Sequence, residues 1–319
     1  MSNFVHLHLH TQYSVLDGAI KLEQLVKRAK SLGQDSIAIT DHGVMHGAVE
    51  FYSAAVAQSI KPIIGCEMYV TSGSRFERIS RAQGGGHTHH LTLLAQNMVG
   101  YRNLCRLVTC GFTEGFYFKP RVDFEILSQY SEGLICLSGC MASELAFFSK
   151  NGDEAAARSL IERYSNLFGE RYFLEVQPHV FREQQEHNQI LRHLGDSLGV
   201  PLVATNDCHY LDPHDHYAQE VLMRISTGKL ITDEDRIRHD ESRLHFKTKD
   251  EMLAGMPGFE DAVNQTASIA SRCELEFDFK THFMPRFDPE DGLSVEEAFR
   301  EEAREGLKDR LARLALREK

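Results

Sequence analysis

Residues 36–70, SIAITDHGVMHGAVEFYSAAVAQSIKPIIGCEMYV, decide the expected fold, because they hold two strand patterns separated by a helical pattern. The β-branched run at 36–40 and the apolar run at 62–70 are both bounded by turn residues, which is typical of strands. Between them, residues 44–59 have the apolar spacing of a helix. A strand, a helix and a second strand predict two parallel strands joined by a crossover.

The same alternation continues along the chain on both sides of this unit. Three further helical patterns, at 20–32, 153–168 and 183–198, each end at a glycine in the position of a C-terminal cap. Seven strand candidates result, at 4–9, 36–40, 62–70, 90–95, 134–138, 172–176 and 201–205. The chain has neither GxGxxG nor GxxxxGK[ST], the glycine-rich loops that bind nucleotide phosphates. The pattern therefore favours a closed β/α barrel with a parallel sheet over a doubly wound nucleotide-binding fold.

Composition excludes several classes of protein. With 319 residues, 42% hydrophobic and 25% charged, the chain is neither disordered, collagen-like nor a coiled-coil rod. It has no apolar run of membrane length and no signal-peptide pattern, so we expect a cytoplasmic protein without membrane contact. Seven cysteines without a CxxC pair argue against a disulfide framework and a zinc ribbon. A net charge of −11 means that any contact with DNA would need a local basic patch or metal ions.

Histidine is the unusual residue, because 17 are present and several stand beside acids. Histidine is the commonest metal ligand in proteins. On the expected barrel, potential ligands fall at carboxyl ends of strands, which converge on one rim. They are His8 and His10, Asp41 and His42, Glu67, Cys140, and Asp207 and His209. His90 is the exception because it opens its strand candidate, so we expect that strand to start earlier.

Several of these residues also have a structural interpretation. Alternation places His6, His8 and His10 on one strand face, as a rack of ligands or as an exposed polar edge. Asp41 could cap the following helix. His90 could be a hydrogen-bonded core residue.

The remaining motifs point more directly to function, although Cys140 alone could be a small buried apolar residue. Glu67 ends an apolar run, where a carboxylate is costly unless it is paired or coordinated. Asp207 and His209 alternate at a strand end and offer two ligands together. Each residue alone is ambiguous, but the occurrence of potential ligands at several strand ends together favours a metal site.

A resemblance to a known family rests on six segments, which occur in order and with close spacing. They are HLHLHTQYSVLDGA (6–19), AITDHGVMHGAVEFY (38–52), IKPIIGCEMYV (60–70), HHLTLLAQNMVGYRNLCRL (89–107), GLICLSGC (133–140) and LVATNDCHYL (202–211). Together they resemble the PHP (polymerase and histidinol phosphatase) domain found at the N-terminus of bacterial DNA polymerase III alpha subunits. The resemblance covers nearly all of residues 1–285.

The resemblance implies a distorted seven-stranded β/α barrel that holds two or three divalent metal ions. The ligands it implies are His8, His10, Asp17, His42, Glu67, His90, Cys140, Asp207 and His209. Among them it assigns catalytic roles to Asp17, Asp207 and His209. Asp17 is implied by the resemblance alone, since LDG by itself indicates a turn, and His6 is placed behind the ligands. Mixed imidazole, carboxylate and thiolate ligands suit zinc, manganese or iron.

The presence of all nine ligand types favours a working metal site and, by resemblance, a 3′→5′ exonuclease that acts on the primer strand. An inert scaffold that docks a separate proofreading subunit and a small-molecule phosphoesterase are the alternatives. The partners implied are a DNA primer terminus, the rest of an alpha chain and replisome subunits such as the sliding clamp.

Two further expectations concern the periphery. Arg75, Arg78 and Arg81 could hold phosphates near the rim, or belong to a solvated surface loop.

We expect residues 1–285 to form the barrel with an extension, and 286–319 to begin the next, polymerase region. Residues 289–319 have the pattern of a charged amphipathic helix with Leu307, Leu311 and Leu314 on one face. We therefore expect a fragment that lacks the polymerase core.

Overall fold

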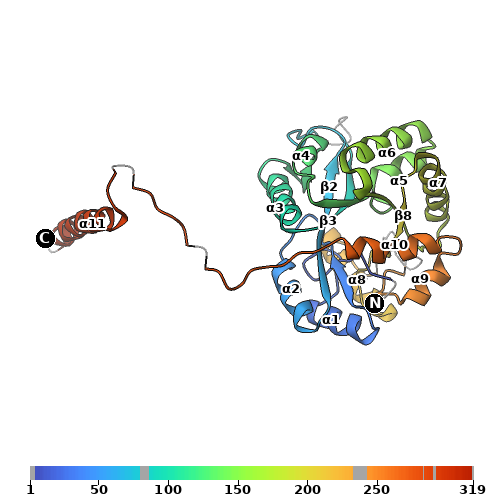
Figure 1. Ribbon diagram of the computed structural model, residues 1–319, viewed down its shortest axis with the longest axis horizontal. Helices are drawn as coiled ribbons and strands as arrows, with labels where there is room; N and C mark the ends of the chain where they lie inside the picture. Colours follow the sequence, from blue (N-terminus) through green and yellow to red (C-terminus); the bar gives the residue numbers. More distant parts are fainter. Residues whose placement is uncertain (1–3, 80–85, 233–242, 283, 290–291, 318–319) are drawn as a thin grey trace. The chain divides into compact units, whose positions relative to one another are not determined.

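The computed structural model describes residues 4–79, 86–232, 243–282, 284–289 and 292–317 (Figure 1). The chain divides into two compact units, Met1–Glu276 and Phe277–Lys319, so the division falls before residue 285. The second unit contains helix α11, Val295–Arg317, in which Leu307, Leu311 and Leu314 are exposed. All the expected ligands lie in the first unit.

A curled sheet surrounded by helices forms the first unit (Figure 1). Its strands are β1 Ser36–Ile39, β2 Lys61–Thr71, β3 Thr88–Ala95, β4 Phe116–Tyr117, β5 Lys119–Val122, β6 Leu134–Leu137, β7 Tyr172–Val176 and β8 Leu202–Ala204. They are ordered β4-β5-β2-β3-β6-β7-β8, and β1 also pairs with β2. The short hairpin of β4 and β5 therefore branches from the sheet at β2.

Strand direction differs from the prediction at one position. β1 is parallel to β2, and β6, β7 and β8 are parallel to one another, but β3 is antiparallel to both β2 and β6. The expectation of a wholly parallel sheet is therefore wrong at β3. The described part of the connection from β2 to β3 contains no crossover helix, and a direct return produces an antiparallel pair. The amino end of β3, which carries His90, thus lies at the same rim as the carboxyl ends of its neighbours.

Residues 4–10 close the barrel without forming the regular strand predicted there. On one side His6 O accepts from Ala38 N (2.9 Å) and Leu9 O accepts from Thr40 N (2.8 Å). On the other side His10 N donates to Cys208 O (2.7 Å), just beyond β8. Segment 4–10 and strands β1, β2, β3, β6, β7 and β8 are the seven members of the distorted barrel. The predicted fold class is confirmed.

The barrel interior has an apolar floor beneath a polar rim. The floor receives buried side chains from every member of the barrel: Val5, Leu7, Ala38, Ile63, Leu94, Ile135, Leu137, Phe173 and Val203. Because strand side chains alternate with a period of two, the same inner face continues from Ile63 to Glu67 and from Phe173 to Glu175. The ends of these strands thus present polar groups above a dry floor.

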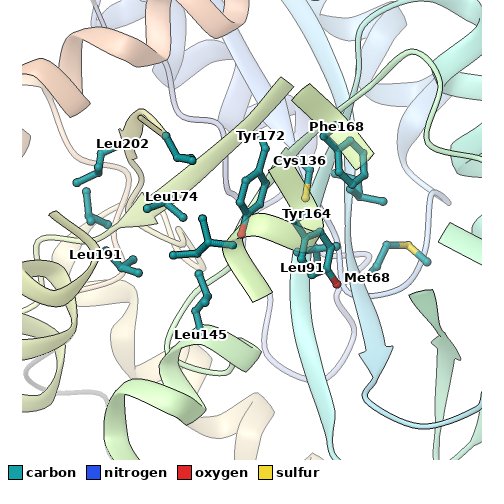
Figure 2. Packing of buried hydrophobic residues seen from close by; sticks show 14 of the residues in the cluster. Met68, Leu91, Cys136, Leu145, Tyr164, Phe168, Tyr172, Leu174, Leu191 and Leu202 are labelled. Atoms are coloured by element: carbon teal, nitrogen blue, oxygen red, sulfur yellow. The ribbon is translucent and has the colours of Figure 1, made fainter. Parts of the chain in front are cut away.

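The outer faces of the same strands pack against helices (Figure 2). Tyr172 and Leu174 of β7 belong to one buried cluster with Leu145, Tyr164 and Leu191 from three different helices. Four helices match predicted ones: α1 Leu22–Ser31, α2 Ala48–Ala57, α6 Glu154–Phe168 and α7 Arg182–Leu198. The others are α3 Met98–Thr113, α4 Phe124–Gln129, α5 Glu144–Asn151, α8 His216–Thr227, α9 Lys249–Gly255 and α10 Glu260–Ser271, with 3-10 turns η2 Gly169–Arg171 and η3 Pro213–Asp215. The helices pack on the outer faces of the strands and thereby support the barrel and its rim.

A buried histidine between α5 and α7 makes the fold sensitive to acid. His187 is 2% exposed, its Nδ1 lies 2.9 Å from Ser149 Oγ, and burial lowers its pKa to about 4. The unfolded chain therefore binds a proton at higher pH than the folded chain. The contribution of neutral His187 to the stability is therefore complete above the unfolded pKa of about 6.5. It is lost as the pH falls from there toward the folded pKa of about 4. We expect this group to cost roughly 2 kcal/mol between neutral pH and about pH 5.

The His187→Gln variant should lose that part of the acid sensitivity. The measurement is urea unfolding at neutral pH and at about pH 5, followed by circular dichroism. His214→Gln is the control, because His214 has an 83% exposed side chain. Equal acid sensitivity of His187→Gln and the unmodified chain would contradict the prediction.

Candidate metal centre

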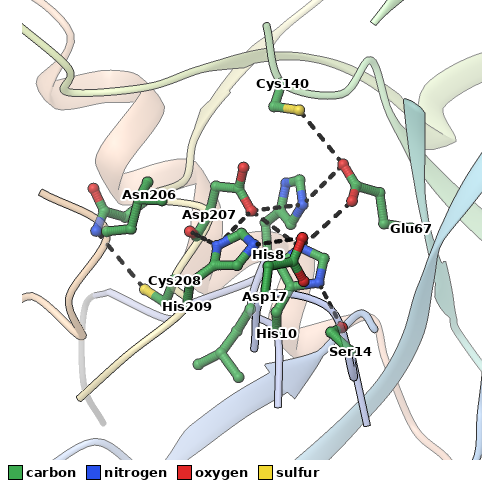
Figure 3. Close-up of polar contacts among 12 residues, drawn as sticks. His8, His10, Ser14, Asp17, Glu67, Cys140, Asn206, Asp207, Cys208 and His209 are labelled. Carbon is green, nitrogen blue, oxygen red and sulfur yellow. Dashed lines mark hydrogen bonds and ion pairs between the residues drawn. The ribbon is translucent and has the colours of Figure 1, made fainter. Parts of the chain in front are cut away.

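The nine residues expected as ligands come together at the polar rim of the barrel, and Figure 3 shows seven of them: His8, His10, Asp17, Glu67, Cys140, Asp207 and His209. They derive from the N-terminal segment (His8, His10), the loop before α1 (Asp17), the turn after β1 (His42), β2 (Glu67), β3 (His90), the loop after β6 (Cys140) and the segment after β8 (Asp207, His209). Seven chain segments thus meet at one place because the barrel brings their strand ends to one rim.

Glu67 lies at the centre of this group. Its Oε1 lies 3.3 Å from His8 Nε2 and 2.9 Å from His90 Nδ1. Its Oε2 lies 3.4 Å from His10 Nε2 and 2.5 Å from His42 Nδ1. The carboxylate is 1% exposed, so the charge that sequence analysis regarded as costly is surrounded by imidazoles.

Cys140 lies on the side of Glu67 that faces β3. Its Sγ is 3.5 Å from Glu67 Oε1 and 3.9 Å from His90 Nδ1. Burial raises the pKa of this thiol well above its usual range. The thiolate form therefore requires a nearby cation, which is the usual condition for a cysteine ligand.

Asp207 forms the second acidic focus. Its Oδ1 lies 3.0 Å from His10 Nε2, 3.3 Å from His8 Nε2 and 3.5 Å from His209 Nδ1. The backbone of Asp207 has a φ of 49°, a left-handed conformation that aspartate and asparagine adopt more readily than most residues. This turn directs the carboxylate back over the barrel interior.

Asp17 closes the site from the loop before α1. Its Oδ2 lies 3.2 Å from His42 Nε2 and 4.0 Å from His209 Nε2. The loop is tight at Gly18, where a Cβ atom would lie 2.0 Å from Thr11 O. The LDG sequence is therefore a turn, as its residues indicate, and the turn also delivers a carboxylate to the site.

Seven of the nine expected ligands, all except Asp17 and Cys140, group into three overlapping triads, each with atoms within 4.8 Å of one another. The triads are His10, His42 and His209; His8, His10 and Asp207; and His42, Glu67 and His90. Among the described residues, several buried atoms of the site have no partner with hydrogen-bond geometry, although all except Asp17 Oδ1 lie within 4 Å of an oppositely charged group: His8 Nε2, His10 Nε2, Asp17 Oδ1, His42 Nδ1, Glu67 Oε2 and Asp207 Oδ1. Buried polar atoms without partners are costly, and a bound cation removes that cost. The nitrogen, oxygen and sulfur donors fit borderline transition-metal ions.

Glu175 is a site residue that sequence analysis missed. Its Oε1 lies 2.5 Å from His8 Nδ1, and Oε1 also accepts from Thr205 Oγ1 (2.5 Å). Its Oε2 accepts from Gly139 N (3.1 Å). A carboxylate on the Nδ1 side directs Nε2 of His8 toward the other ligands, as carboxylate–histidine pairs do at metal sites. A single acid in the otherwise apolar run YFLEV was the signal for it.

Ser14 and Asp41 position the other N-terminal histidine. Ser14 Oγ lies 3.0 Å from His10 Nδ1 and donates to Asp41 Oδ1 (2.8 Å). Asp41 also accepts from Thr11 N (2.6 Å). It therefore fastens residues 11–14 and does not cap α2, which starts at Ala48.

The buried charges shift the pKa values of the ring nitrogens in opposite directions. Burial lowers the pKa of His8, but Glu175 and Asp207 outweigh it and raise that pKa well above its usual range. Burial and the neighbouring His42 lower the pKa of His10 to about 3. Because metal ions bind the neutral imidazole, ligation at His8 would release a proton.

A cavity of about 370 Å³ opens above these residues. Asp17, His42, His90, Cys140, Asp207 and His209 line it. His8, His10 and Glu67 lie beneath and are at most 1% exposed. A substrate in the cavity would therefore contact the open side of the ligand cluster.

His6 and the arginine loop have other roles. His6 is fully buried behind the ligands, with Nδ1 3.3 Å from Cys208 Sγ. Arg75 does not serve as a phosphate ligand, because it is buried and paired with Asp123 (3.1 Å) and Glu114 (2.7 Å). Arg78 donates to backbone carbonyls instead, and Arg81 lies outside the described residues.

Residues 6–179 match the model of the PHP domain family, and the chain belongs to this family. The match spans every expected ligand except Asp207 and His209, which follow it in the chain.

Curated relatives match almost the whole chain. It is 42% identical to the DNA polymerase III subunit alpha of Treponema pallidum over 97% of this chain and 27% of that protein. The corresponding subunit of Deinococcus radiodurans is 43% identical over 93% of this chain and 23% of that protein. The chain thus spans about a quarter of the length of these relatives.

A solved amidohydrolase from Chromobacterium violaceum superimposes with a TM-score of 0.40 and 16% identity, over 65% of this chain and 88% of that one. Within the described residues, no helix is long and apolar enough to cross a membrane.

Proposed function

We propose that the metal centre hydrolyses the terminal phosphodiester of a DNA primer strand in the 3′→5′ direction, as the PHP domain of a DNA polymerase III alpha subunit. The observation that supports the proposal is the convergence of all nine residues on one rim, where six of them line the cavity and His8, His10 and Glu67 lie beneath it. The curated relatives of this chain are DNA polymerase III alpha subunits. A polymerase subunit holds a primer end, which would be the substrate of the metal centre. The cavity above the ligands is open to such an end.

Two or three divalent ions, of zinc, manganese or iron, would occupy the three triads. When bound, they supply a nucleophile at neutral pH and neutralise the charge of the phosphodiester. Glu67, Asp207 and Asp17 offset the positive charge of the ions. Asp17 has the most exposed side chain of the three, at 26%, and therefore faces the substrate side.

His209 has a defined tautomer in this arrangement. Its Nδ1 lies 2.8 Å from Asp207 O, and a carbonyl can only accept, so Nδ1 carries the proton. The lone pair of Nε2 then faces Asp17 and the cavity. There Nε2 would be a ligand of an ion or the acceptor of a proton from water, which is why we propose a catalytic role for His209 together with Asp17 and Asp207.

The setting follows from the same proposal. The partners would be the primer terminus, the remainder of the alpha chain and replisome subunits such as the sliding clamp and a proofreading subunit, in the cytoplasm.

The direct test measures the products from a 3′-recessed primer labelled at its 5′ end, with the 319-residue chain and with the full alpha subunit. We expect stepwise shortening that requires manganese, zinc or iron and stops with chelator. A phosphomonoester such as p-nitrophenyl phosphate is tested in parallel. Hydrolysis of the monoester alone would indicate a small-molecule phosphoesterase. Bound metal without hydrolysis in either protein would indicate a scaffold.

Metal removal should also lower stability. Ions that bind the folded but not the unfolded chain add about 2.7 kcal/mol at a hundredfold excess over Kd. We expect a chelator to lower the Tm by several degrees in differential scanning calorimetry, and added metal to restore it. An unchanged Tm in a sample shown by mass spectrometry to lose its metal would contradict this.

A further inference from the structure

A second, larger groove adjoins the metal centre. It has a volume of about 860 Å³ and shares Met141, Ala142 and Phe181 with the metal-centre cavity. The two spaces are therefore continuous over these residues. A ligand longer than one nucleotide that has its end at the metal centre would extend into this groove.

The hairpin of β4 and β5 presents an aromatic ring to the groove. Phe118 occupies the turn between the two strands, is 80% exposed and has a φ of 59°. A bulky residue in the left-handed region is strained, and such strain is concentrated at functional positions. The ring of Tyr117 lies edge-on at 4.6 Å, so the exposed ring has a fixed neighbour.

Two lysines line the groove together with this ring. They are Lys119 and Lys150, and none of the ion pairs among the described residues involves either amine, although Glu183 also lines the groove. Lys119 Nζ lies 5.1 Å above the ring of Tyr69, which itself packs against His90 at 5.1 Å. Positive charge therefore reaches from the groove to the edge of the metal centre, although the whole chain carries −11.

The hairpin is held firmly enough to serve as a platform. Arg121 Nε donates to Gly115 O (3.1 Å), and Arg121 Nη2 donates to Glu77 O (2.6 Å). Gly43, next to ligand His42, packs so closely that a Cβ atom would lie 2.9 Å from Pro120 Cγ. The hairpin and the turn that bears a ligand are thus in direct contact.

We propose that this groove binds the single-stranded 3′ segment of a DNA strand, with one base stacked on Phe118 and the backbone phosphates beside Lys119 and Lys150. Exposed aromatic rings together with cations are the usual elements of single-strand binding. The inference rests on the proposed function for the direction of the strand. It makes Phe118 a positioning residue and assigns it no part in bond cleavage.

The first test uses the fact that the chain contains no tryptophan. Phe118→Trp introduces a unique tryptophan, which can be excited selectively, in an Asp207→Asn background so that the oligonucleotide is not degraded. We expect saturable quenching by oligothymidylate of about ten nucleotides, since stacked bases contact the ring. Phe116→Trp is the matched control, because Phe116 is 49% exposed on the same hairpin but does not line the groove.

The second test measures affinity and kinetics. Phe118→Ala should weaken oligothymidylate binding about tenfold and raise KM with little change in kcat, whereas Phe118→Tyr should retain both values. Lys119→Gln and Lys150→Gln should each lower the slope of log affinity against log salt by about 0.7. Lys27→Gln, on α1, removes the same charge elsewhere and should leave the slope unchanged.

The outcomes separate this inference from the proposed function. Primer hydrolysis with unchanged KM in Phe118→Ala, or equal quenching in both tryptophan variants, would contradict DNA binding in the groove. Neither result would contradict the proposed nuclease activity. Stacking and salt dependence as expected, without hydrolysis of any primer, would support DNA binding in the groove and contradict the proposed nuclease activity. Binding of a polypeptide but not of oligothymidylate would assign the groove to a protein partner and overturn the inference.

Discussion

Asp207→Asn is expected to reduce primer hydrolysis by at least about a thousandfold while leaving the fold intact. The carboxylate contacts His8, His10 and His209, and the amide removes its charge at nearly constant volume. Asparagine also tolerates the left-handed backbone at this position, where φ is 49°. The measurement is the rate of 3′ nucleotide release, with circular dichroism as the check on folding.

Asp196→Asn is the matched control for this prediction, because Asp196 has a 69% exposed side chain on α7, outside the site. It should leave the rate unchanged. The comparison is made in the full alpha subunit as well as in the chain described above, since the polymerase region would deliver the strand. Undiminished release by Asp207→Asn would show that the activity arises elsewhere.

Gly100→Ala is expected to destabilise the barrel by about 3 kcal/mol, although alanine normally stabilises a helix interior. Gly100 lies in α3, and a Cβ atom there would lie 1.8 Å from Gly133 O. That oxygen belongs to the backbone just before β6 and accepts from Gln96 N (2.8 Å), so it cannot move without breaking this long-range hydrogen bond. The helix would have to shift away from the sheet.

Urea unfolding followed by circular dichroism measures this effect. Gly306→Ala provides the opposite case, because Gly306 lies within α11 and no atom lies within 4 Å of the added carbon. That variant should leave barrel stability unchanged and increase helicity slightly. A stability of Gly100→Ala equal to that of the unmodified chain would show that α3 can adjust its position at no cost.

The local elements were predictable because their causes are local. The apolar runs of β2, β6 and β7 and the helical spacing of α6 and α7 lie within single segments, and the structure has them close to the predicted bounds. A helix start is less certain, since α2 begins at Ala48 after a turn that serves the site.

The chemistry of the candidate ligands was also visible in the residues. Imidazoles and carboxylates at strand ends indicate metal binding wherever a fold brings strand ends together. The acidic turn residue Asp17 was found only through the family resemblance. The residues of an LDG turn predict the turn but not which distant residues the aspartate contacts. Whether the nine residues bind metal stays a prediction.

What the sequence by itself determined is therefore six of the barrel strands, the helices α1, α2, α6, α7 and α11, and the donor atoms at the strand ends. The tertiary structure alone decided the direction of β3, the closure of the barrel by residues 4–10, the place of Glu175 behind His8 and the use of Arg75 as a buried ion-pair partner. Each of these depends on atoms from segments far apart in the chain. Hydrogen bonding and charge pairing at such distances follow from packing, which no local pattern of residues encodes.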